Sequence, residues 1–164
     1  MADTSYLRRE VEPHVRAELA VQHGQPFSSQ FLKLRTGGRH EFDAVSADGQ
    51  IVAGIKAASG LTAGGRIPSG KINSSLAELY YLSLVEARMR LLVLTNPEFH
   101  EIFLKKTSGA IADGIAVVCM PLPEAMQAEV DAVVRRASDE VSPAVAEKIV
   151  ASEVEEATSE LLDE

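Results

Sequence analysis

The chain has 164 residues, of which 46% are hydrophobic and 24% are charged, a composition typical of a soluble globular protein with one core. Its single cysteine, Cys119, excludes an internal disulfide and leaves no second thiol for a zinc site. No apolar run approaches the roughly 20 residues that cross a bilayer, and the first residues lack the apolar segment of a secretory signal, so we expect a cytoplasmic protein with no membrane partner.

The first third of the chain predicts one helix and three strands. Asp3, Thr4 or Ser5 can cap the helix, which runs to about Gln22, with Gly24 ending it. Pro13 either kinks this helix or stands in the first turn of a second one. The strands follow in the stretches FLKLRT, HEFDAVS and IVAGIKA, and the Asp48-Gly49 pair between the last two predicts a hairpin.

The next part of the chain alternates helices and strands. A glycine-rich loop precedes a largely apolar helix from about Asn73 to Ala87, and the buried strand RLLVLT comes next. Asn96-Pro97 opens another helix, and GIAVVCM is a second buried strand. This order, αβββαβαβ, predicts an α/β (α+β) fold with a mixed central sheet and helices on both faces.

The residues after Pro121 differ in pattern and in charge. They predict two amphipathic helices joined at Ser142-Pro143, a C-terminal helical hairpin. Residues 1–120 carry 13 Lys or Arg against 12 Asp or Glu, whereas residues 121–164 carry 3 against 12, which gives +1 and −9 and sums to the net charge of −8. We therefore divide the chain into a core domain, 1–120, and an acidic helical extension, 121–164. We expect the extension to pack on the core or to join copies of the chain into a homo-oligomer.

The glycine-rich loop resembles a phosphate-binding loop, because Gly65 is followed by four residues and then Gly70-Lys71. Ile72 stands where that motif has the Ser or Thr that ligates magnesium. Neither later strand ends in the acidic residue that such a site also needs. A surface loop with a solvated Lys71 is the simpler interpretation, and nucleotide binding is the weakest of our functional hypotheses.

The hairpin holds a more specific set of charged residues. Residues two apart in a strand face the same side, so Glu41 and Asp43 project together, and Gly54 and Lys56 share a face of the partner strand. A turn centred on Asp48-Gly49 sets position 43 opposite 54 and brings Lys56 near Glu41. Carboxylates that hold Mg²⁺ beside a lysine that offsets phosphate charge are a plausible phosphoryl-transfer site.

On the stretch EFDAVSADGQIVAGIK, the chain resembles the PD-(D/E)xK nuclease superfamily, which has the restriction-endonuclease-like fold. The resemblance implies that Asp43 is a metal ligand and that Lys56 is catalytic. Gly54 stands where the second acid belongs. Members of this superfamily can carry a further Glu on the first helix, where Glu18 falls inside the apolar stripe and Glu12 at its edge. Glu18, Glu12 or Glu41 is therefore expected to replace the missing acid, with Mg²⁺ as the cofactor.

Two main functional hypotheses remain open. The first is a metal-dependent nuclease that binds DNA or RNA through residues 1–120, with Asp43, Lys56, Glu41 and Glu18 as catalytic residues and Asp43, Glu18 and Glu12 as metal ligands. The second is a catalytically inactive module, a pseudoenzyme that acts as a scaffold and dimerises through its C-terminal helices. In that case, Asp43 and Glu41 form only ordinary ion pairs with Lys56 across the hairpin.

Overall fold

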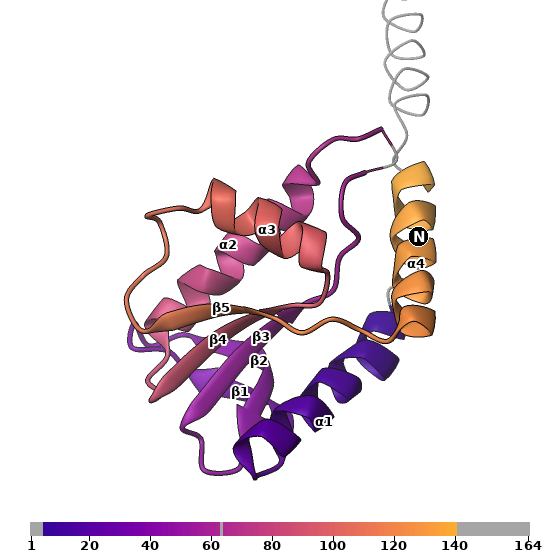
Figure 1. Cartoon of the computed structure of the whole chain (residues 1–164). Helices are drawn as coiled ribbons and strands as arrows, with labels where there is room; N and C mark the ends of the chain where they lie inside the picture. The colour runs from indigo at the N-terminus through magenta and orange to yellow at the C-terminus, as the bar shows by residue number, and fades with distance from the viewer. Residues whose placement is uncertain (1–4, 63, 141–164) are drawn as a thin grey trace, which may run out of the picture.

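The computed structural model describes residues 5–62 and 64–140, which form one five-stranded sheet covered by helices on both faces (Figure 1). Among these residues, no helix combines the length and apolar character needed to cross a membrane. The elements in chain order are η1 (Leu7–Val11), α1 (Glu12–His23), β1 (Phe27–Lys33), β2 (Arg39–Ser46), β3 (Ile51–Lys56), α2 (Ser69–Leu84), β4 (Met89–Leu94), α3 (Pro97–Lys106), β5 (Ile115–Cys119) and α4 (Glu124–Glu140).

The sheet is mixed, and its strands lie in sequence order from β1 to β5. β1, β2 and β3 pair antiparallel, as expected for strands joined by short turns, and β3, β4 and β5 pair parallel through helical crossovers. The predicted α+β architecture and its order of elements are confirmed. The predicted hairpin is present as well, with Ala44 opposite Ala53 and Gly49 in the turn at a φ of 70°.

Each face of the sheet has its own apolar core. α2 and α3 cover one face, where their side chains pack on Phe42, Val52 and Leu92. α1 and α4 cover the other face, where Val15 and Val130 pack on Ile55. The first helix of the acidic extension therefore packs on the core domain. The second predicted helix of the extension and the turn before it lie outside the described residues.

The first helix is built in two pieces. A π-helical turn, η1, leads directly into α1, and Pro13 stands in the first turn of α1. Gly24 ends α1 in the left-handed conformation, with a φ of 69°. Pro13 thus has the first-turn position of one interpretation, but the helix continues through Val11 and Glu12 without stopping, with a π-helical turn before the proline.

Two element boundaries differ from the sequence-based expectation. β1 begins at Phe27, before the FLKLRT stretch, because Phe27 already pairs with Ser46 of β2. α2 begins at Ser69 instead of Asn73, and the backbone N–H groups of Lys71 and Ile72 donate to the carbonyl of Pro68. Lys71 therefore belongs to the first turn of a helix, not to the loop.

Candidate active site

β2 and β3 separate from each other at Asp43. Their pairing covers Val45↔Val52 and Ala44↔Ala53 and goes no further toward Lys56. On the other side of β2, the pairing with β1 steps from Ser28↔Val45 to Gln30↔Phe42, so β2 holds one extra residue and forms a bulge there. The bulge turns the Asp43 side chain into the gap between the strands, where its Oδ2 accepts a hydrogen bond of 2.7 Å from the N–H of Ile55.

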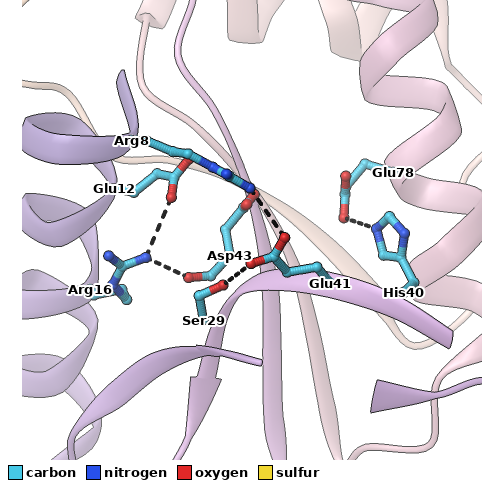
Figure 2. A network of polar contacts seen from close by, with 8 residues as sticks. All are labelled: Arg8, Glu12, Arg16, Ser29, His40, Glu41, Asp43 and Glu78. Atoms are coloured by element: carbon cyan, nitrogen blue, oxygen red, sulfur yellow. Dashed lines mark hydrogen bonds and ion pairs between the residues drawn. The ribbon is translucent and has the colours of Figure 1, made fainter. Parts of the chain in front are cut away.

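The Asp43 carboxylate is largely buried, and burial raises its pKa above the ordinary value. The hydrogen bond from Ile55 and the charges of Lys56 and Arg16 act in the opposite direction, whereas the charge of Glu78 raises the pKa further. Asp43 is thus electrostatically coupled to groups from both sides of the sheet. In Figure 2, Glu12 and Arg16 lie on one side of Asp43, and Glu78 lies on the other.

Glu78 is the acidic residue of the site that the sequence-based reasoning missed. It projects from the buried face of α2, and its side chain is 8% exposed. Its Oε2 lies 3.0 Å from Nζ of Lys56, and its Oε1 lies 3.3 Å from Nε2 of His40. The His40 ring stacks on Tyr81, with 3.8 Å between the ring centroids, so His40 is held firmly beside the Glu78 carboxylate.

The side chain of Glu78 occupies the space next to Gly54. A Cβ atom at position 54 would lie 2.7 Å from Cδ and 2.8 Å from Oε1 of Glu78, and closer still to its Cγ. Gly54 is buried in β3, two residues before Lys56. The carboxylate of Glu78 therefore lies where a side chain at position 54 would begin. The sequence offered one signal of this role, because an acidic residue on a largely apolar helix needs a buried partner.

The two glutamates of the first helix differ in environment. Glu12 is half-buried, and its Oε2 lies 3.5 Å from Nη1 of Arg16. Burial is the main cause that raises the pKa of Glu12, and the charge of Asp43 adds to it. Glu18 is exposed, so its predicted place on the buried stripe is wrong. On a helix of 3.6 residues per turn, the two glutamates project about 60° to either side of Val15, and only the flank with Glu12 faces Asp43.

Glu41 does not pair with Lys56. Its Oε2 lies 3.1 Å from Nη2 of Arg8, and its Oε1 accepts a hydrogen bond of 3.0 Å from Ser29 (Figure 2). The predicted ion pair across the hairpin does not form, because the pairing of β2 with β3 does not extend from Ala44 to Glu41. The bulge in β2 also breaks the alternation that would have put Glu41 and Asp43 on the same face. Glu41 thus contacts residues on the α1 side of the sheet, and Lys56 pairs with Glu78.

The glycine-rich segment contributes a lysine to the same region. Lys71 is largely buried, and its pKa is lowered first by burial and then by the charge of Lys56. The interpretation of Lys71 as a solvated loop residue is therefore wrong. Ile72 belongs to the apolar core between α2 and the sheet, so the residue after the lysine offers no ligand for the magnesium of a nucleotide.

Comparisons with protein-family models, with curated proteins and with solved structures found no match to this chain. Within residues 5–62 and 64–140, no group of three or more His, Cys, Asp or Glu side chains is placed to hold a metal ion. The candidate site therefore rests on its own geometry, which is Asp43 in the gap between two strands, Lys56 at the end of β3, and Glu78 over Gly54.

Proposed function

We propose that the protein is a metal-dependent hydrolase of phosphodiester bonds in DNA or RNA. Asp43 and Glu78 would hold Mg²⁺, and Lys56 would stabilise negative charge on the phosphate. The observation that carries the proposal is the fit of Glu78 into the space beside Gly54. It supplies a carboxylate next to Lys56 at the position where the resemblance to PD-(D/E)xK nucleases implies an acid. The sequence-based expectation that Glu18 or Glu41 replaces this acid is given up.

The donor set suits Mg²⁺, although it consists of two carboxylates, Asp43 and Glu78, which affect each other by charge, and not of three. Mg²⁺ keeps several waters and is commonly bound by one or two carboxylates together with phosphate oxygens of the substrate. Burial and the charge of Glu78 raise the pKa of Asp43, and the charge of Asp43 helps to raise that of Glu12. A bound cation would reduce this repulsion and stabilise the ionised carboxylates. Bound there, Mg²⁺ would polarise a phosphate oxygen and favour an ionised water.

Each residue of the site has a definite task in this proposal. Lys56 brings a positive charge to within 3.0 Å of Glu78, and in the presence of substrate that charge would lie beside a phosphate oxygen. His40 orients the Glu78 carboxylate from the side that Lys56 does not contact. Arg16 donates a 2.8 Å hydrogen bond to the backbone carbonyl of Asp43 and holds the bulge in place. Glu12 could approach the cation as a further ligand.

The test is cleavage of plasmid DNA and of single-stranded RNA with Mg²⁺ or Mn²⁺. We expect activity in the wild type and its loss in Asp43→Asn, Lys56→Met and Glu78→Ala. Glu101→Ala, which removes an exposed glutamate from α3, is the matched control and keeps activity. Moving the acid back to the strand in Gly54→Glu/Glu78→Ala should restore part of the activity. Full activity in Glu78→Ala would contradict the assignment, and an inert wild type on both substrates would contradict the hydrolase.

A second candidate is an interaction module of the same fold without catalysis. The observation that favours it is the ion pair of Lys56 with Glu78, which satisfies both charges without a metal. Calorimetry with Mg²⁺ and Mn²⁺ separates the two candidates. Heat of binding that disappears in Asp43→Asn supports the hydrolase, and no heat at millimolar ion supports the inert module. Dimerisation through the C-terminal helices remains a prediction, because most of that segment lies outside the described residues.

A further inference from the structure

The inner side of α2 carries three polar residues in one row. Lys71, Ser75 and Glu78 are separated by four and three residues, a spacing that sets them on the same side of a helix. Lys56 interacts with both ends of the row, by contact with Glu78 and by charge with Lys71. Glu78 forms the 3.0 Å ion pair with it, and the charge of Lys56 helps to lower the pKa of Lys71. Ser75 lies between them and faces the same region.

The charges along this row are not balanced. Within the part of the chain that the structure describes, no ion pair is recorded for Lys71, although the side chain is largely buried. The nearest carboxylate of the row, Glu78, is already shared by Lys56 and His40. A buried ammonium without a counter-charge is costly, so this position favours the arrival of an anion.

Two further groups at this position lack partners. The hydroxyl of Ser75 is fully buried and has no hydrogen-bond partner. The N-terminus of α2 has no side-chain cap, because the residue in the cap position is Pro68. The N–H groups of Lys71 and Ile72 donate to the carbonyl of Pro68, so the uncapped N–H groups at this end are those of Ser69 and Gly70, and such groups form a partial positive charge that attracts phosphate. An ammonium, a buried hydroxyl and an uncapped helix N-terminus thus lie within the first two turns of α2, and the ammonium is close enough to Lys56 to feel its charge.

We propose that Lys71, together with Ser75 and the first turn of α2, binds a phosphate of the nucleic-acid backbone next to the phosphate that is cleaved at Asp43 and Glu78. This inference rests on the proposed function for the identity of the substrate. It also gives a role to the Ser69-Gly70-Lys71 segment. The segment resembles a nucleotide-binding loop in sequence, but its lysine is a largely buried residue in the first turn of α2.

The first experiment uses inorganic phosphate as the probe and follows the backbone amides of the full chain by NMR. We expect saturable shifts at Ser69, Gly70 and Lys71 in the wild type, and their loss in Lys71→Met. The control is Lys105→Met, which removes a lysine from the exposed end of α3 and should leave the shifts intact. Lys71→Met removes a desolvated charge, so its melting temperature should not fall. An absence of shifts in the wild type would overturn the proposal without any variant.

The second experiment measures binding of a short labelled duplex by fluorescence anisotropy over a range of salt concentrations. Asp43→Asn serves as the background, because cleavage is expected to be blocked there. Adding Lys71→Met should reduce the slope of log K against log salt by about 0.9, the loss of one phosphate contact. An unchanged slope overturns the phosphate site even when the wild type cleaves nucleic acid. Phosphate-induced shifts in a wild type that cleaves nothing would leave the anion site standing and overturn only the hydrolase.

Discussion

The contact between Gly54 and Glu78 predicts a large effect of a very small substitution. In a strand interior, replacing Gly by Ala ordinarily stabilises by roughly 0.5–1 kcal/mol, because Gly loses more conformational freedom on folding. In Gly54→Ala, the new methyl group would lie 2.7 Å from Cδ of Glu78, and Glu78 is held in place by Lys56 and His40. Overpacking of this kind costs about 1–3 kcal/mol, which exceeds the usual gain, so we expect Gly54→Ala to lower the free energy of unfolding.

This cost can be measured as a melting temperature and as a coupling energy. For a chain of 164 residues, about 2–4 °C of melting temperature corresponds to each kcal/mol, so we expect a decrease of roughly 2–12 °C in Gly54→Ala. The control is Gly70→Ala, which has free space around the added methyl and should be neutral or slightly stabilising. In the Glu78→Ala background, the cost of Gly54→Ala should disappear, which gives a coupling energy of about 1–3 kcal/mol in a double-mutant cycle. An equal cost in both backgrounds would refute the packing of Glu78 over Gly54.

Two further predictions concern stability. The pKa of Asp43 is raised by burial, so its folded-state contribution is fully present below the ordinary value of 3.8 and is lost as pH rises through the folded pKa. We therefore expect Asp43→Asn to be more stable than the wild type at pH values above the folded pKa of Asp43. Urea unfolding from about pH 3 to about pH 8 measures this difference, and a variant less stable than the wild type at the upper end of this range would contradict the raised pKa. Phe103→Ala should lower the free energy of unfolding by about 3–5 kcal/mol, because Phe103 is fully buried between α3 and the sheet. Leu104→Ala, at the neighbouring position that is 38% exposed, should cost far less. Equal losses of stability in chemical denaturation would contradict the burial of Phe103.

The order of helices and strands was predictable because it depends on local patterns. Gly24 ends α1, the Asp48-Gly49 pair forms the hairpin turn, and Asn96 caps α3 by accepting from the N–H of Phe99. The hairpin register was predictable too, because the turn fixes which residues of its two strands lie opposite each other, and this register is what singled out Asp43 and Lys56 as candidate residues.

The remaining residues of the site depend on contacts between distant segments. Glu78 and Gly54 are 24 positions apart and meet only because α2 crosses back over β3. The bulge in β2, which directs Asp43 into the gap and leaves Glu41 with Arg8, arises from the pairing with β1. The helical wheel favours Glu18, inside the apolar stripe, over Glu12 at its edge, and the packing of α1 beside Asp43 reverses that order. The sequence determines turns, caps and strand register, because these depend on residues close together in the chain. The approach of Glu78 to Gly54 depends on how α2 packs on the sheet, which only the tertiary structure decides.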